Sequence, residues 1–117
     1  MIEKVGNDLF LPRGDTAKLK VNIISQYLAT ENDRVLFTIK DKSNHPIIIR
    51  VITPVANTAV IEFTNEMTKN LPLGKYKYDI RFVRDAVLED GVPVGGDGVD
   101  TPRRIGAFNL WETVGDV

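Results

Sequence analysis

Apolar and polar residues alternate with a period of two along much of the chain. In residues 17–23 every odd position is apolar and every even position is polar, and residues 34–40 keep apolar side chains at each odd position. Residues 75–84 repeat the pattern, with aromatic and aliphatic side chains at alternate positions. Successive side chains of a β-strand point to opposite faces of a sheet, so this spacing predicts strands with one buried and one solvated face.

The remaining apolar segments complete an all-β pattern. Strands are predicted at 8–11, 17–23, 34–40, 46–53, 58–63, 75–84 and 104–111. Residues 65–70 predict a single helical turn, and no amphipathic stretch is long enough to connect neighbouring parallel strands. Short strands separated by turn residues are typical of two antiparallel sheets packed face to face. We therefore predict an immunoglobulin-like antiparallel β-sandwich of about seven strands, with a partly closed barrel as the alternative.

The segment Leu-Pro-Leu-Gly-Lys-Tyr at 71–76 predicts a sharp corner before the strand at 75–84. Proline and Gly74 redirect the chain there. In immunoglobulin-like sandwiches a tyrosine near this place bonds upstream backbone through its hydroxyl. We assign Gly74 and Tyr76 to a structural corner, with Tyr78 as the alternative for the tyrosine.

Residues 89–102 differ in character from the rest of the chain. They hold four glycines, two prolines and three aspartates, a composition that buries little apolar area. We predict a long, mobile loop that serves as a contact element or as an idle insertion. Its glycines lack the Lys-Ser/Thr pair of a phosphate-binding loop, and Asp90, Asp97 and Asp100 miss the spacing of an EF-hand. We expect solvated carboxylates there and no metal site.

Length and charge narrow the function classes. The 117 residues, 43% of them hydrophobic, are enough for one core, so we predict a single domain over 1–117. Fifteen basic residues nearly balance 16 acidic ones, which predicts neither a nucleic-acid nor a membrane partner. The absence of cysteine excludes disulfides and thiolate chemistry. The N-terminal residues lack the pattern of an export signal, and no apolar run approaches the ~20 residues that span a bilayer.

His45 is the only histidine, so a catalytic triad or a multi-histidine metal site would need it. It stands between Asn44 and Pro46, where we predict a surface turn between two strands. No Gly-x-Ser-x-Gly element accompanies it. We therefore expect no enzyme activity, no catalytic residue and no cofactor, and keep a small hydrolase only as a remote alternative.

Arg13, Gly14 and Asp15 form the integrin-binding tripeptide. Three-residue matches arise often by chance, and this one would need an exposed loop tip. Glycine favours a turn and aspartate bonds nearby backbone, so we interpret the tripeptide as an ordinary turn.

Four aromatic residues, Tyr76, Tyr78, Phe82 and Trp111, invite comparison with surfaces that stack on bases or sugars. Grooves for single-stranded nucleic acid are lined by cations, and the balanced charge argues against that use. Aromatic residues at alternate strand positions favour a core role, with Trp111 at a rim or an interface.

Several segments taken together resemble a known family. They are Asp-Leu-Phe-Leu-Pro-Arg-Gly-Asp-Thr at 8–16, Asp-Arg-Val-Leu-Phe-Thr-Ile-Lys at 33–40, Leu-Gly-Lys-Tyr-Lys-Tyr-Asp-Ile-Arg at 73–81 and Asp-Thr-Pro at 100–102. The set resembles the immunoglobulin-like domains of tailed bacteriophages and prophages. The likeness is strongest to the N-terminal domain of upper baseplate proteins of phages that infect Gram-positive bacteria, and it spans residues 8–110.

This resemblance implies a non-catalytic structural or attachment module of a phage or prophage tail or baseplate. Its partners would be other tail or baseplate proteins, with a homo-oligomer also open. The protein would be made in the bacterial cytoplasm and reside in the virion. Because sandwich folds host many functions, a surface carbohydrate-binding or adhesion module is the alternative.

Overall fold

The computed structural model describes residues 2–112, and Met1 and residues 113–117 of the predicted domain lie outside them. These residues form β1 (Glu3–Val5), β2 (Asp8–Pro12), β3 (Ala17–Asn22), β4 (Arg34–Lys40), β5 (Pro46–Ile52), β6 (Thr58–Phe63), α1 (Asn65–Thr68), β7 (Gly74–Glu89), β8 (Val92–Asp97) and β9 (Arg104–Trp111). The predicted helical turn is confirmed as α1. None of the described helices is long and apolar enough to cross a bilayer.

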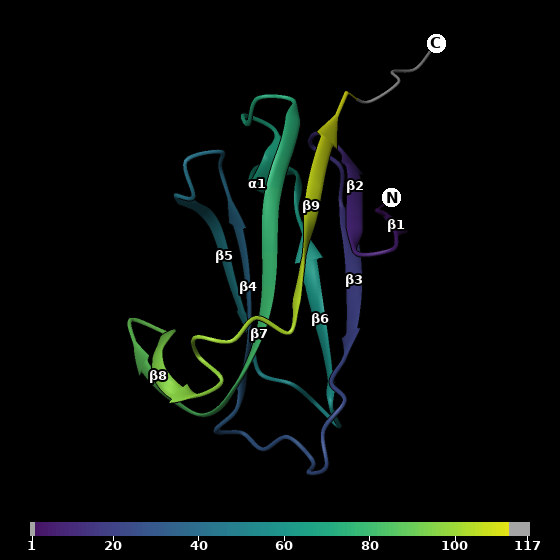
Figure 1. Cartoon of the computed structure of the whole chain (residues 1–117). Helices are drawn as coiled ribbons and strands as arrows, with labels where there is room; N and C mark the ends of the chain where they lie inside the picture. The colour runs from purple at the N-terminus through teal and green to yellow at the C-terminus, as the bar shows by residue number, and fades with distance from the viewer. Residues whose placement is uncertain (1, 113–117) are drawn as a thin grey trace.

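The strands form two sheets (Figure 1). Six strands of the larger sheet follow the order β1-β2-β9-β7-β4-β5, and β8 pairs with β7 away from this row. The second sheet holds β3 and β6. The all-β class is confirmed, but the predicted count of about seven strands is wrong, because β1 and β8 were not predicted.

The predicted purely antiparallel pairing is also wrong, because β2 runs parallel to β9. Leu9 lies opposite Phe108 and Leu11 opposite Leu110, and all four side chains are buried. The parallel pair brings together a strand near the start of the chain and the last strand. Parallel strands need a long connection, and here all the strands from β3 to β8 lie within it. Nothing in the local alternation of either strand specifies this direction.

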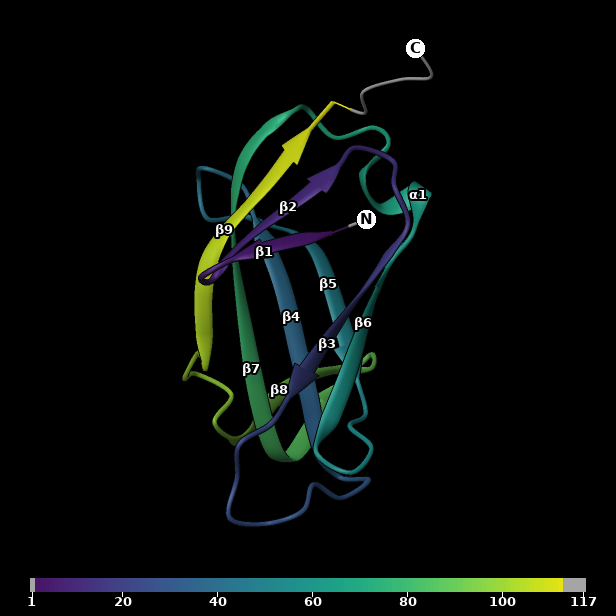
Figure 2. The ribbon, with the colours of Figure 1, turned by 90° about the vertical axis from the view of Figure 1, so that its right-hand side faces the viewer.

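The two sheets face each other (Figure 2). The core lies between them, where aromatic rings pack together. Phe63 of β6 meets Phe37 of β4 edge-on at 5.6 Å between centroids, and it stacks on Phe108 of β9 at 5.8 Å. Such pairs contribute about 0.5–1.5 kcal/mol beyond the burial of their area. Phe63 therefore fastens the two-stranded sheet to the middle of the larger one.

The predicted mobile loop at 89–102 is wrong in its first part. Strand β7 continues to Glu89, and β8 returns antiparallel to it. The two-residue turn between them is Asp90-Gly91, with φ of 51° and 79°. Positive φ at both positions is the geometry of a type I′ turn, for which Asp-Gly is a preferred sequence. The backbone pairing of this hairpin orders a segment that buries little apolar area.

Strand β7 bends where the hairpin begins. Asp85 has a φ of 50°, and the register with β8 shifts between Arg84 and Val87. Residues of β7 up to Val83 pair with β4 or β9 in the main sheet, whereas the residues from Arg84 onward pair with β8 alone. We call residues 85–102 the arm. Figure 1 shows it curling away from the main sheet at the lower left.

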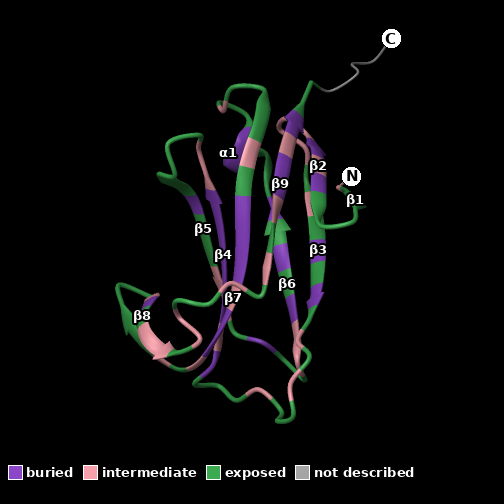
Figure 3. Cartoon of the chain, in the orientation of Figure 1, coloured by how far each residue is buried: buried purple, intermediate pink, exposed green. Residues whose placement is uncertain are grey.

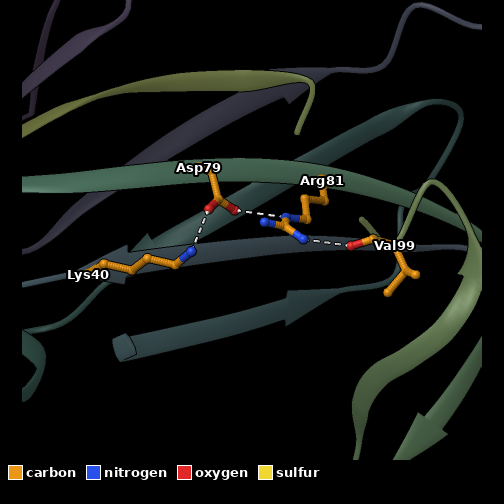
Figure 4. Close-up of polar contacts among 4 residues, drawn as sticks. All are labelled: Lys40, Asp79, Arg81 and Val99. Atoms are coloured by element: carbon orange, nitrogen blue, oxygen red, sulfur yellow. Dashed lines mark hydrogen bonds and ion pairs between the residues drawn. The ribbon is translucent and has the colours of Figure 1, made fainter. Parts of the chain in front are cut away.

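The returning part of the arm is fastened to the sheet by a short chain of charges (Figure 4). Asp79, largely buried, lies 3.5 Å from Lys40 Nζ and 3.3 Å from Arg81 Nε. Arg81 Nη1 donates to the Val99 carbonyl at 2.7 Å. Pairing with Asp79 orients the guanidinium, so Arg81 holds the arm's last residues against the sheet.

Candidate functional site

The structure places His45 in the exposed turn between β4 and β5. Its Nδ1 lies 3.7 Å from Asp41 Oδ2, and the amides of Ser43 and His45 donate to Asp41 Oδ1 at 2.8 and 3.0 Å. The hydrogen bond from the His45 amide lowers the pKa of Asp41. These contacts are those of a residue that shapes a turn, so this pair organises the β4–β5 connection.

The Arg13-Gly14-Asp15 turn lies against α1 and does not project. The Gly14 amide donates to Thr68 Oγ1 at 2.8 Å, and Asn65 Nδ2 donates to the Gly14 carbonyl at 2.8 Å. Gly14 has a φ of 79°, which favours glycine over other residues. The tripeptide therefore serves to join the end of β2 to the helix.

The acidic residues predicted to be solvated lie along the arm. Asp90 is in the hairpin turn, Asp97 ends β8 and Asp100 follows it, and all three are exposed. Within residues 2–112, no three His, Cys, Asp or Glu side chains come together as a metal site. Carboxylates spread in this way contribute charge to a surface.

The predicted corner residues lie at the start of β7. Gly74 has a φ of 144°, and the Tyr76 hydroxyl donates to the Pro72 carbonyl at 2.5 Å. Tyr78, the alternative, is buried and donates its hydroxyl to the Asn7 carbonyl. Burial raises the pKa of both tyrosines. The two hydroxyls thus tie β7 to two different upstream segments.

Trp111 differs from the other aromatic residues singled out from the sequence. Tyr78 and Phe82 are buried in the core, whereas Trp111 is 47% exposed. Its ring lies 5.7 Å from that of Phe10, on the neighbouring strand β2. The pair forms a partly exposed aromatic surface near the end of β9.

A second apolar surface, which the sequence did not reveal, lies at the opposite end of the molecule. Ile24 and Val55 are 89% and 76% exposed, and Tyr27 and Leu28 are also exposed. They belong to the 23–33 connection between β3 and β4 and to the 53–57 connection between β5 and β6. Figures 1 and 2 both place these connections at the lower end, and we call the four residues the apolar end.

Asn57 holds the two connections together. Its Oδ1 accepts from the Ala29 amide at 2.5 Å, and its Nδ2 donates to the Tyr27 carbonyl at 3.2 Å. Its own carbonyl accepts from the Ile23 amide at 2.7 Å. One side chain thereby fixes the backbone on both sides of Leu28, so the apolar side chains project from an ordered framework.

Asp33 links the same region to the arm. Its carboxylate accepts from the Thr30 amide at 2.8 Å and from the Asp85 amide at 3.0 Å, and the residue is only 1% exposed. Burial raises the pKa of Asp33, but these hydrogen bonds and the charge of Arg84 outweigh it, so the pKa lies below its ordinary value. The bonded amide of Asp85 is the one at the bend of β7.

Two further contacts complete this framework. The Ala86 amide donates to the Asn32 carbonyl at 2.9 Å, and the Arg84 guanidinium lies 5.0 Å above the Tyr27 ring. A cation over an aromatic face is attracted by the electrons of the ring. Figure 3 shows largely exposed and half-buried residues along this end and the arm, in contrast to the buried middle of β7 and β9.

A cavity of about 180 Å³ adjoins the apolar end, lined by residues that include Val21, Ile23, Phe82 and Arg103. Sites that bury drug-sized ligands measure about 300–1,000 Å³. Arg103 also donates to the Ile24 carbonyl at 3.3 Å. The dimensions suit a surface that takes up one side chain of a partner better than a pocket for a whole small molecule.

The chain matches no protein-family model. No curated protein is significantly similar to it.

Proposed function

We propose that this chain is a non-catalytic, immunoglobulin-like module that binds other proteins through its apolar end. The row β2-β9-β7-β4-β5 facing β3 and β6, with a corner tyrosine at the start of β7, supports the immunoglobulin-like assignment. In such domains the connections at one end of the sandwich commonly carry recognition. The placement of His45 in an exposed turn supports binding over catalysis.

The observation that carries the proposal is the gathering of Ile24, Tyr27, Leu28 and Val55 on an ordered framework. Burying one large apolar side chain contributes about 1.5–3 kcal/mol, so four of them supply substantial binding energy. Connections already fixed by Asn57 and Asp33 lose little conformational entropy when a partner docks. Large exposed apolar patches on soluble proteins are typical of interaction sites.

The class of partner follows from the resemblance of the segments at 8–16, 33–40 and 73–81 to phage tail domains. We propose that the partners are other tail or baseplate proteins and that the module acts in the virion. The balanced total charge supports a protein partner over nucleic acid or an anionic membrane.

Co-expression with the products of the neighbouring genes tests this function. Ile24→Asp and Leu28→Asp are expected to abolish co-purification with the partner while leaving the thermal unfolding midpoint unchanged. Val5→Asp, an equally drastic change at an exposed site on β1, is the matched control and is expected to leave binding intact. Equal recovery of the partner by all three variants would exclude the apolar end as the binding surface.

A carbohydrate-binding role is the second candidate, and the Phe10–Trp111 pair favours it. Exposed aromatic faces stack on the apolar faces of sugar rings. A glycan array probed with the wild type and with Trp111→Ala tests it: signals lost in the variant support the role, and an array without signals rejects it.

A further inference from the structure

The nearly neutral total charge hides a strong separation of charge. The arm, residues 85–102, carries five acidic residues, Asp85, Glu89, Asp90, Asp97 and Asp100, and no lysine or arginine. Taking these five from the total of 16 acidic residues leaves 11 against 15 basic ones, so the rest of the chain has a net charge of +4. The arm is therefore an acidic element on a basic body.

The arm also exposes apolar side chains. Val87, Leu88 and Val94 are all exposed on the hairpin. The hairpin is held at its base by the Ala86 amide and on its return by the Val99 carbonyl. A projecting element that combines apolar side chains with carboxylates has the composition of a protein interface. Because the hairpin is already ordered, it loses little conformational entropy when it binds.

A basic apolar groove lies on the other half of the molecule. It is an open depression of about 590 Å³ whose lining includes Lys42, Lys75, Lys77, Ile105 and Ala107. Lys77 pairs with Ala107 across β7 and β9, at positions that alternate with the buried Tyr78 and Phe108. These residues therefore face away from the core, and we call this site the lysine groove.

Two aspartates, Asp8 and Asp41, also line the lysine groove, so its three lysines leave a net charge of +1, and both carboxylates already accept backbone hydrogen bonds. Asp8 Oδ1 accepts from the Ala107 amide at 3.0 Å, and Asp41 Oδ1 accepts from the amides of its own turn. The lysine ammonium groups donate hydrogen bonds and accept none, so backbone amides do not occupy them. The volume lies within the about 300–1,000 Å³ of sites that enclose a ligand, which suits the tip of a hairpin.

The arm does not reach the lysine groove of its own molecule. Lys77 and Val87 are ten residues apart on β7, and a strand rises about 3.3 Å per residue, so roughly 30 Å of strand separates them. The arm is anchored to the sheet at Asp33 and Arg81, and the hairpin turn at its tip, Asp90-Gly91, lies beyond Val87. Docking between these two surfaces must therefore join different molecules.

We infer that a second copy of this chain docks its acidic arm in the lysine groove, so that the molecules assemble head to tail. Arm and groove are different surfaces, so the contact is heterologous and propagates into a ring or an open filament. Opposite charges steer the encounter, and the apolar side chains of the arm and Ile105 become buried. These surfaces lie outside the apolar end, so the inference and the proposed function succeed or fail separately.

Sedimentation velocity of the full chain over a range of concentrations tests the inference. Self-association is expected to be stronger at about 50 mM than at about 500 mM salt, because ions screen exposed charges. Glu89→Lys with Asp90→Asn changes the arm and keeps a residue that suits the type I′ turn. Lys75→Glu with Lys77→Glu changes the groove, and Lys18→Glu with Lys20→Glu, on the exposed side of β3, is its matched control.

Each of the two interface variants is expected to associate at least about tenfold more weakly than the wild type, and the β3 control to associate normally. A mixture of the arm variant and the groove variant retains one intact arm and one intact groove. The mixture is therefore expected to form a one-to-one dimer that does not extend. Leu28→Asp is expected to leave self-association unchanged.

Three results would overturn the inference. The first is a wild type that stays monomeric at high concentration and low salt. The second is self-association that persists in both interface variants. The third is a mixture of the two variants that remains monomeric although each variant keeps its thermal stability. In any of these cases loss of partner binding in Leu28→Asp would still support the proposed function.

Discussion

Replacing Asp33 by alanine is expected to lower the free energy of unfolding by about 2–3 kcal/mol. The substitution removes the acceptor of two amides, those of Thr30 and Asp85. A donor left without a partner costs about 1–3 kcal/mol, and the low end, about 1–1.5 kcal/mol for each amide, applies because Thr30 and Asp85 are exposed to water. The change corresponds to a fall of roughly 8–12 °C in the thermal midpoint.

Urea denaturation of the wild type and the variant measures this difference. Asp100→Ala, an exposed aspartate on the arm, is the matched control and is expected to change stability by less than about 0.5 kcal/mol. Hydrogen exchange gives a local readout, because the Asp85 and Ala86 amides are expected to lose protection in Asp33→Ala. A variant as stable as the control, with both amides still protected, would refute the assignment of Asp33 as the link between the arm and the apolar end.

The same carboxylate makes stability depend on acid. The pKa of Asp33 is lower in the folded protein than its ordinary value. Ionised Asp33 therefore contributes stability that is fully present above the unfolded pKa of about 3.9, and this contribution is lost as the pH falls through the folded value. Asp33→Asn is expected to flatten the acid limb of the pH–stability profile below about pH 5. Superimposable acid limbs would contradict this.

Three further substitutions test other parts of the structure. Gly106→Ala places a Cβ 2.7 Å from the ring of Tyr78 and against the Asn7 carbonyl, so thermal unfolding is expected to show a loss of more than about 2 kcal/mol. Tyr76→Phe removes the bond to Pro72 and is expected to cost about 0.5–1.5 kcal/mol in urea denaturation. Trp111→Ala is expected to lower the free energy of unfolding by less than about 1 kcal/mol, followed by circular dichroism during denaturation, because the residue is already 47% exposed.

Strands β3 and β6 were readable from the sequence because each has one buried and one solvated face, whereas β4 is buried on both faces from Val35 to Ile39. In β3, Leu19 and Val21 are buried between exposed lysines, and β6 alternates in the same way. Burial against a single core imposes a period of two on the side chains, and that period is a local property. The class of the fold follows from it.

The arm was missed for the opposite reason. Its strands are held by backbone pairing and bury few side chains, so apolar periodicity is weak there. The Asp90-Gly91 turn was a usable signal, because this dipeptide favours a type I′ hairpin. The glycine-rich composition on its C-terminal side led instead to the prediction of a loop.

The proposed binding surfaces were decided by tertiary structure alone. The 23–33 and 53–57 connections meet through Asn57 only because β3 and β5 end on the same side of the fold (Figure 1). Asp33 meets the Asp85 amide across 52 residues of sequence. The parallel direction of β2 beside β9 likewise depends on everything between them. Local sequence patterns indicate which face of a strand is buried. Which distant segments come into contact depends on how the two sheets pack around Phe63.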